Sequence, residues 1–281
     1  MRVFFISDLH YGVSLKGDAA VRLQADGISD VGRKDDVLII GGDIAVDDAM
    51  IGGCLKLFRR FRGTRFAIPG NHDIWVDPGD DSADRFNRLT TVFEKHGFIR
   101  LDNRPYLIGR TAFVGNMGWY DYSFRDDIGV DEEAYRLKSY PGRISISWAD
   151  KQYVRWQYDD QEVTERLVVR LREDLEVAAG LADRIIVAMH HLPVKRLLVH
   201  PRWLVPKHWR FANAFLGSER FGAEILRHKD KVESVFCGHV HHHARAVVEG
   251  VEFVSNGGDY NEKSLLLQED GAYERFLTIT A

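Results

Sequence analysis

Short apolar runs, each followed at once by a polar motif, are the main pattern along this chain. Their residues are mostly β-branched or aromatic, and glycine or polar residues follow them. Runs without polar alternation predict strands that are buried on both faces. The five predicted strands are Val3 to Ile6, Val37 to Ile40, Phe66 to Ile68, Ile185 to Met189 and Val235 to Cys237.

Three stretches carry apolar residues at three- and four-residue spacing, the period of an amphipathic helix. They are residues 82–96, 160–179 and 218–228, and glycine follows the first two as a C-terminal stop. Toward the end of the chain, residues 246–254, 264–268 and 275–280 are predicted as antiparallel strands, with a turn at 256–258. The strands and helices together predict an α/β fold.

Two segments, at about 119–156 and 192–217, do not fit the succession of strands and helices. Both are rich in aromatic residues and arginine. Long irregular insertions in a compact domain are usually functional loops or lids, so we expect a cap or rim around a site. No linker or repeat divides the chain, and 281 residues are enough for one large core. The expectation is a single domain over residues 1–281.

A polar motif follows each of the five predicted strands. Because open α/β sheets present their ligands where strands end, these motifs are expected to form one shared site. The spacings Asp8-x-His10 and His239-x-His241 would put both side chains on the same side of an extended segment. In chain order the motifs are Asp8-Leu9-His10, Gly42-Asp43, Gly70-Asn71-His72-Asp73, His190-His191 and Gly238-His239-Val240-His241.

The side chains in these motifs are oxygen and nitrogen donors. Such a set suits Mn, Fe or Zn better than calcium, and the absence of cysteine argues against a structural zinc site. Asn71 can bind a cation only through its amide oxygen. The chain has two cysteines, Cys54 and Cys237, and the second ends a predicted buried strand, so both are expected to be structural thiols rather than a disulfide framework.

Charge and hydropathy narrow the class of partner. The formal net charge is -4, which gives no general attraction to nucleic acid or to an acidic membrane surface. No run approaches the roughly 20 apolar residues of a membrane span, and no signal-peptide pattern precedes the first strand. A cytoplasmic location and a small-molecule partner are the default expectations; the oligomeric state stays open.

The ordered motifs resemble those of the calcineurin-like metallophosphoesterase superfamily over residues 8–241. The resemblance implies a four-layer α/β/β/α sandwich of two mixed sheets flanked by helices. It also implies a site with two divalent metal ions. One ion would be bound by Asp8, His10 and His241, the other by Asn71, His190 and His239, with Asp43 shared between them.

The same resemblance implies a reaction, the hydrolysis of phosphoesters by in-line attack of a metal-bridging hydroxide. His72 would protonate or hydrogen-bond the leaving group, and Asp73 would orient or charge His72. A phosphodiesterase acting on small to medium substrates is slightly favoured over a phosphatase. The alternatives are a nuclease of the same superfamily, which the net acidity disfavours, and a non-catalytic metal-binding scaffold.

Other residues near the motifs are weaker candidates for substrate contact. His191 could touch substrate or simply pack, Trp119 and Tyr122 could stack on substrate or on the core, and Arg125 could contact phosphate. For Asp47 and Asp48, a helix N-terminus is a simpler explanation than metal binding.

Overall fold

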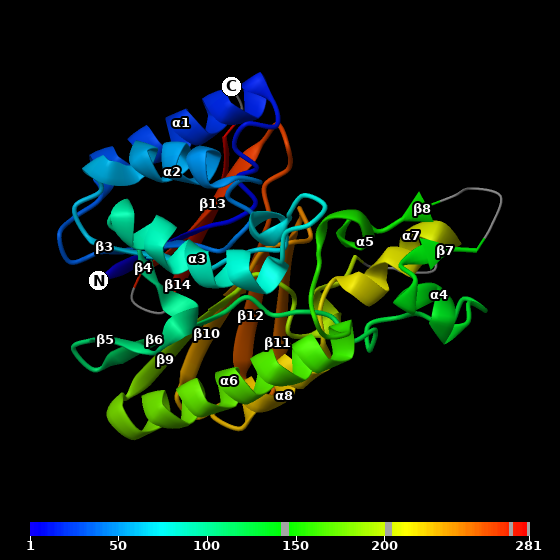
Figure 1. The fold of residues 1–281 in the computed structure, drawn as a ribbon. Coiled ribbons are helices and arrows are strands. Elements are labelled where there is room, and N and C mark those ends of the chain that lie inside the picture. Colours follow the sequence, from blue (N-terminus) through cyan, green and yellow to red (C-terminus); the bar gives the residue numbers. More distant parts are fainter. Residues whose placement is uncertain (142–145, 200–203, 270–271, 280–281) are drawn as a thin grey trace.

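The computed structural model describes residues 1–141, 146–199, 204–269 and 272–279. Parts of both predicted insertions, 142–145 and 200–203, and position 280 of the predicted last strand lie outside these residues. Two six-stranded mixed sheets pack face to face (Figure 1). The first has the order β14-β13-β1-β2-β3-β4, comprising Ala272–Ile279, Lys263–Glu269, Arg2–Ile6, Val37–Ile40, Thr64–Ala67 and Ile99–Arg100.

The second sheet has the order β11-β12-β10-β9-β6-β5. Its strands are His243–Val248, Val251–Asn256, Val232–Cys237, Arg184–Met189, Thr111–Asn116 and Tyr106–Ile108. In both sheets the central strands are parallel and the C-terminal hairpins are antiparallel. The chain therefore places the ends of β1, β2 and β3 opposite those of β9 and β10.

Alternate residues of each central strand belong to different cores, which explains the unbroken apolar runs. In β1, Val3 and Phe5 face the second sheet and share a core with Phe236, whereas Phe4 and Ile6 pack against helices. In β9, Ile185 and its alternating neighbours pack against helices of the other side. The three cores separate four layers, so the predicted α/β/β/α sandwich is confirmed.

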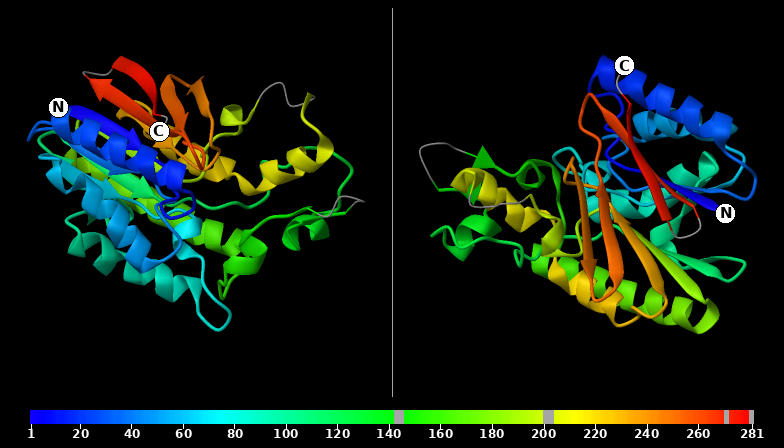
Figure 2. Two further views of the ribbon diagram at one scale, coloured as in Figure 1. Left: turned by 90° about the horizontal axis from the view of Figure 1, so that it is seen from above. Right: turned by 180° about the vertical axis from the view of Figure 1, so that it is seen from behind.

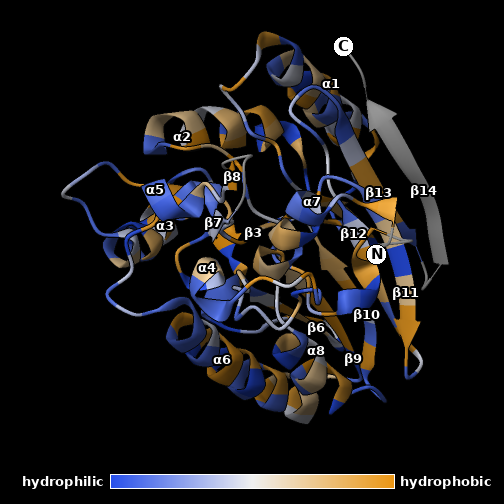
Figure 3. Cartoon of the chain, turned by 90° about the vertical axis from the view of Figure 1, so that its right-hand side faces the viewer, coloured by the Kyte–Doolittle hydropathy of each residue, from blue (hydrophilic) through white to orange (hydrophobic). Residues whose placement is uncertain are grey.

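Helices α1 (Leu15–Val31), α2 (Asp48–Leu57) and α3 (Ser82–Lys95) cover the first sheet, and α6 (Asp160–Leu181) and α8 (Glu219–Leu226) cover the second (Figure 1). The helices α6 and α8 alternate hydrophilic and hydrophobic residues, as expected when only one face meets a sheet (Figure 3). Asp47 caps α2 by accepting a hydrogen bond from the Met50 amide, so the predicted helix N-terminus is confirmed.

The two predicted insertions lie side by side at one end of the sheets (Figures 1 and 2). The first contains α4 (Glu132–Arg136), β7 (Ser139–Tyr140), β8 (Ile146–Ser147) and α5 (Asp150–Tyr153). The second contains α7 (Lys207–Ala212). The Lys195 ammonium group donates a hydrogen bond to the Arg125 carbonyl oxygen at 2.9 Å and so connects the two segments.

The structure differs from the sequence prediction in one predicted strand and in two elements that were not predicted. The single strand predicted at 246–254 is a hairpin of β11 and β12, which turns at Glu249 and Gly250. Both residues have positive φ, 50° and 89°, the left-handed geometry of a tight two-residue hairpin turn. The sequence reading also missed α1 and β6. The buried positions of α1 include Gly17, Gln24 and Ser29 beside Val21 and Ile28, so small and polar residues interrupt the apolar pattern of its inner face.

None of the helices in the described residues is long and apolar enough to cross a membrane.

Both cysteines are free, buried thiols in different cores: Cys54 lies on the buried face of α2, and Cys237 ends β10. Burial raises the pKa of each thiol. We expect neither to react with Ellman's reagent in the native protein, and both to react in denaturant. Rapid labelling of either thiol under native conditions would contradict this packing.

Candidate metal centre

The motifs that follow β1, β2, β3, β9 and β10 converge at the seam between the two sheets. Their donor atoms form two groups in which all atoms lie within 4.8 Å of one another. Asp43 belongs to both groups. The first group contains Asp8, His10, Asp43 and His241, and the second contains Asp43, His190 and His239.

Short distances within the first group bring two ring nitrogens and two carboxylates to one point. The Nε2 atoms of His10 and His241 are 3.0 Å apart. His241 Nε2 is 3.5 Å from Asp8 Oδ1, and His10 Nε2 is 3.8 Å from Asp43 Oδ2. Converging imidazole and carboxylate donors of this kind fit a transition-metal cation.

In the second group, three potential metal-ligand atoms surround the Nε2 atom of His190. It lies 3.3 Å from Asp43 Oδ1, 3.2 Å from His239 Nδ1 and 3.1 Å from the amide oxygen of Asn71. Asn71 therefore joins this group through its oxygen, the atom that can bind a cation. The structure thus brings the seven candidate ligands together in two sets with Asp43 in common.

Backbone carbonyls fix which nitrogen of each histidine faces the centre. His190 Nδ1 lies 2.9 Å from the Gly41 carbonyl oxygen, and His239 Nε2 lies 3.2 Å from that of Phe215. Each of these nitrogens donates its hydrogen to the carbonyl oxygen. The other nitrogen of each ring, His190 Nε2 or His239 Nδ1, therefore has a free lone pair that can bind a cation. Burial lowers the pKa of His190, and lowers that of His239 to about 3, so both rings are neutral donors at pH 7.

The backbone at the ligands differs from the extended segments that the sequence spacing suggested. Asp8, His10, Asp43, His239 and His241 all have positive φ, between 43° and 72°. Left-handed backbone is costly for these residues and is held by the surrounding structure, as is common at functional sites. The His10 amide donates to the Asp43 carbonyl oxygen at 2.9 Å, and the Asp8 amide to that of Gly42 at 3.1 Å.

Two glycines allow the close approach of these loops. A Cβ atom at Gly70 would lie 2.2 Å from Asp43 Oδ1, and one at Gly238 would lie 1.9 Å from the Ser7 hydroxyl oxygen. Any side chain at either position would displace the loop that carries a ligand. The glycines of the Gly-Asn-His-Asp and Gly-His-x-His motifs are thus explained by packing at the seam.

The pKa values of the two buried carboxylates, Asp8 and Asp43, are shifted in opposite directions from their ordinary value. Burial and the charges of Asp8 and Asp73 raise the pKa of Asp43 well above its ordinary value. Burial would also raise the pKa of Asp8, but the neighbouring His241, His190 and His10 bring it below its ordinary value. A cation between these carboxylates would relieve their mutual repulsion, so the donor set fits the metal ions that the motifs imply.

His72 lies at the edge of the centre and faces the adjoining cleft. Its ring stacks on Trp75 with centroids 3.7 Å apart and an interplanar angle of 24°, and its Nε2 is 3.8 Å from Asp43 Oδ2. The ring of Trp75 stacks in turn on Tyr153 of α5, at 4.6 Å. The first insertion therefore supports the ring of His72 from behind.

The geometry of Asp73 does not support the expected role of orienting His72. Its Oδ1 accepts hydrogen bonds from the amides of Ile44 and Ala45, at 2.8 and 3.0 Å, and its Oδ2 accepts one from Gly70 at 2.8 Å. This carboxylate is therefore directed at the backbone that carries Asp43 and Asn71. It holds two ligand loops together.

The four weaker candidates for substrate contact do not line the cleft. His191 is fully buried behind His239, with ring centroids 4.2 Å apart. Trp119 and Tyr122 are buried and donate hydrogen bonds to Asp160, at 2.9 and 2.5 Å. Arg125 is paired with Glu132. The structure therefore places three of these side chains in the core and pairs the fourth with a carboxylate at the surface.

A cleft of about 490 Å³ opens beside the two donor groups. Its floor is formed by motif residues, and much of its wall comes from the second insertion. No lysine or arginine is among its lining residues within the described parts of the chain. They are Asp43, Asn71, His72, Trp75, Trp148, Ala149, Val199, Val205, Trp209, Ala212, Asn213, Leu216, His239, Val240, His241, His242 and Tyr260.

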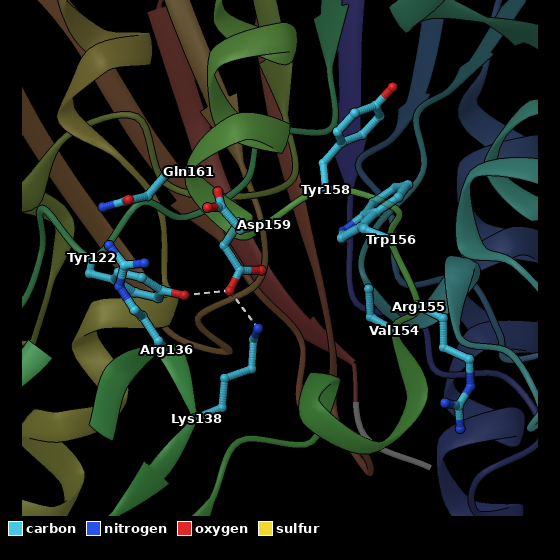
Figure 4. A pocket seen from close by; sticks show the side chains of 10 residues that line it. Tyr122, Arg136, Lys138, Val154, Arg155, Trp156, Tyr158, Asp159 and Gln161 are labelled. Carbon is cyan, nitrogen blue, oxygen red and sulfur yellow. Dashed lines mark hydrogen bonds and ion pairs between the residues drawn. The ribbon is translucent and has the colours of Figure 1, made fainter. Parts of the chain in front are cut away.

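A second cavity of about 280 Å³ lies between α4 and the start of α6 (Figure 4). Its lining includes cationic side chains, but Lys138 donates to Asp160 at 2.5 Å and Arg136 pairs with Glu132 at 3.2 Å. Tyr122 donates to the same Asp160 carboxylate. The charges of Lys138 and Arg136 are thus compensated within the protein, and none of the candidate metal ligands lines this cavity.

One buried residue beside the centre was missed by sequence reasoning. Asp150 is 1% exposed and accepts hydrogen bonds from Asn71 and from three aromatic side chains. It stands alone in the charged first insertion, with no motif around it. Nothing in the sequence distinguishes it from the surface carboxylates nearby.

A family model described as calcineurin-like phosphoesterase matches residues 1–243. The chain belongs to this family. It is therefore a metallophosphoesterase, of a dimetal enzyme class, and its clustered donors agree with that assignment. The expected superfamily is confirmed.

Solved structures share the fold at low sequence identity. Phosphopantetheinyl hydrolase from Mycobacterium tuberculosis is 20% identical, over 92% of this chain and 89% of that one, with a TM-score of 0.72. A dimetal phosphatase from Danio rerio is 12% identical, over 100% and 98%, with a TM-score of 0.55. The anchor in the inner membrane complex of Plasmodium is 11% identical, over 99% and 89%, with a TM-score of 0.52. No curated protein matches the sequence significantly.

The contacts of Asp73 lead to a test of its role. Asp73→Ala would leave three buried amides without an acceptor, so we expect the free energy of unfolding to fall by at least about 2 kcal/mol. His72→Ala should reduce activity with little loss of stability. Urea unfolding of both variants separates the two roles. Unchanged stability in Asp73→Ala, together with lost activity, would instead favour the original expectation that Asp73 acts through His72.

Proposed function

We propose that this metallophosphoesterase hydrolyses small phosphodiesters at the seam between its two sheets. The observation that carries the proposal is the sharing of Asp43 by two donor groups at the floor of an open cleft. Two cations in such an arrangement, when bound, activate a water molecule and stabilise the attacking and leaving oxygens of an in-line displacement.

The ligands are assigned from the distances around the two groups. Asp8, His10 and His241 would hold one cation, and Asn71, His190 and His239 the other, with Asp43 between them. Neutral imidazoles and carboxylates accept Mn, Fe or Zn, and availability decides among them. The left-handed loops and the carbonyls of Gly41 and Phe215 hold these donors in place before any substrate arrives.

His72 is proposed to act on the leaving group. Its side chain is 15% exposed, and it lines the cleft beside Asp43. Stacking on Trp75 restricts the ring, and its Nε2 lies 3.8 Å from Asp43 Oδ2. A ring held there would hydrogen-bond the leaving oxygen or give it a proton, a contribution of typically about 100- to 10,000-fold.

The lining of the cleft favours a diester with an uncharged leaving group. A monoester carries up to two negative charges beside the metals, whereas a diester carries one. The described lining residues include no lysine or arginine to balance an additional charge, and many are apolar, including Val199, Val205, Trp209 and Leu216.

Two alternatives are less well supported. A nuclease would need basic residues along a longer path, and the described lining of the cleft has none. A scaffold would rest only on the similar fold of the Plasmodium anchor, and fold alone does not give function. The complete set of ligands and the accessible His72 favour an enzyme.

Removal of the metal tests the proposed chemistry. We expect the metal-stripped protein to be inactive on bis-p-nitrophenyl phosphate and p-nitrophenyl phosphate, and reloading with Mn²⁺ to restore activity, mainly on the diester. Asp43→Ala should stay inactive after reloading and should bind fewer than two Mn²⁺ per chain, because it lacks the shared ligand. Circular dichroism controls for folding. A preference for the monoester would refute the substrate class, and activity of Asp43→Ala would refute the shared site.

Truncation of the cleft wall tests the apolar leaving-group contact. Trp209→Ala removes an indole from the cleft, and we expect KM for bis-p-nitrophenyl phosphate to rise roughly fivefold, from about 1 kcal/mol of lost apolar contact. The kcat value should stay unchanged, because the contact binds substrate and transition state alike. Tyr158→Ala, which removes an exposed aromatic ring of the second cavity, is the matched control. Equal effects of the two variants would show that Trp209 has no special contact with substrate.

A further inference from the structure

The buried carboxylate of Asp150 is the acceptor for four side chains around the metal centre. It lies at the start of α5, in the first insertion. Its Oδ1 accepts from the Asn71 amide group and the Trp75 indole, both at 2.9 Å. Its Oδ2 accepts from the Tyr120 hydroxyl at 3.0 Å and the Trp148 indole at 2.9 Å. All four partners are donors, which matches a carboxylate, an acceptor with about four lone-pair sites.

The bond to Asn71 decides which end of that amide faces the centre. Since Nδ2 donates to Asp150, Oδ1 is left on the opposite side, 3.1 Å from His190 Nε2. An amide rotated by half a turn would present its NH₂ group to the cation, and that group cannot serve as a ligand. The orientation of the weakest ligand of the second donor group therefore depends on an acceptor from a different part of the chain.

The same carboxylate also fixes the two indoles that flank the centre. Trp75 carries the stacked ring of His72. Trp148 lies edge-on to His239, with centroids 5.9 Å apart, and stacks on Phe215 at 5.3 Å. One acceptor thus sets the positions of a metal ligand, the support of His72 and part of the cleft wall.

We propose that Asp150 is a positioning residue that orients the Asn71 oxygen toward the second cation and thereby sets the affinity of that one site. The inference rests on the proposed metal centre. It assigns to the first insertion a function in metal binding, through a residue that touches neither the cation nor the substrate. Hydrogen-bond partners of metal ligands typically change affinity by about 10- to 100-fold when they are removed.

The test is a titration of metal-stripped protein with Mn²⁺, read as free Mn²⁺ by electron paramagnetic resonance, which yields two binding constants without any substrate. We expect Asp150→Ala to weaken one of the two constants by about 10- to 100-fold and to leave the other near the wild-type value. Asp150→Asn should lie between wild type and Asp150→Ala. It keeps one oxygen for Asn71 but loses the charge that strengthens the bond.

Asp160 provides the matched control. It is also buried, and it accepts from three donors, Trp119, Tyr122 and Lys138, but it contacts none of the proposed ligands. Asp160→Ala and Asp160→Asn should lower thermal stability and leave both Mn²⁺ constants unchanged. The comparison separates an effect on the Asn71 amide from a general effect of removing a buried carboxylate in this region.

The outcomes distinguish this inference from the proposed function. Wild-type protein that binds fewer than two Mn²⁺ would overturn the metal centre itself. Two sites in wild type, with equal constants in the Asp150 and Asp160 variants, would overturn the positioning role alone. If Asp150→Ala does not fold, Asp150→Asn decides: weaker binding at one site than in Asp160→Asn supports the role, and equal binding refutes it.

Discussion

The contact on which the site depends is the one between the loop after β1 and the loop after β10. Both carboxylate oxygens of Asp8 accept from the His239 amide, at 3.0 and 3.1 Å, and so join the two sheets at their common edge. The His190 ring adds a second link, from the second sheet to the Gly41 carbonyl of the first. These links act together with the apolar core between the sheets, which contains Phe5 of the first sheet and Phe236 of the second. The same contacts therefore position the candidate ligands and pack the two sheets together.

The sequence predicted the parts of the structure that rest on repeated local signals. Unbroken apolar runs indicated strands between two cores. In β1, Val3 and Phe5 belong to the core between the sheets and Phe4 to the core under the helices, so both faces of the strand must be apolar. Motifs at strand ends indicated a shared site, because strand ends meet at one sheet edge. The helix α1 was missed since its buried face contains small and polar residues such as Gly17 and Gln24. The hairpin of β11 and β12 was missed since Glu249 gives no turn signal of its own.

The roles of the carboxylates could not be predicted, because they depend on distant backbone and side-chain donors. Asp73 lies within a metal motif, yet its carboxylate accepts hydrogen bonds from backbone amides of the loop after β2. Asp150 lies in no motif, yet it holds Asn71 from 79 positions along the chain. The backbone conformation was misjudged for a related reason. Spacing alone allows Asp8 and His10 to share a side of an extended segment, but the chain must turn sharply at the seam, and both residues are left-handed.

The electrostatics of the cleft connect the metal centre to the choice of substrate. The described lining residues of the cleft supply no cationic side chain, so among these parts of the chain the attraction for a phosphate group would come from cations held by the two donor groups. Asp8, Asp43 and Asp150 reduce that attraction, since all three carboxylates are buried within or beside the centre. In a site of low dielectric, each further negative charge on the substrate is expensive to accommodate. An ester with one charge and an uncharged second arm, the proposed substrate class, would meet both the polar floor and the apolar wall of this cleft.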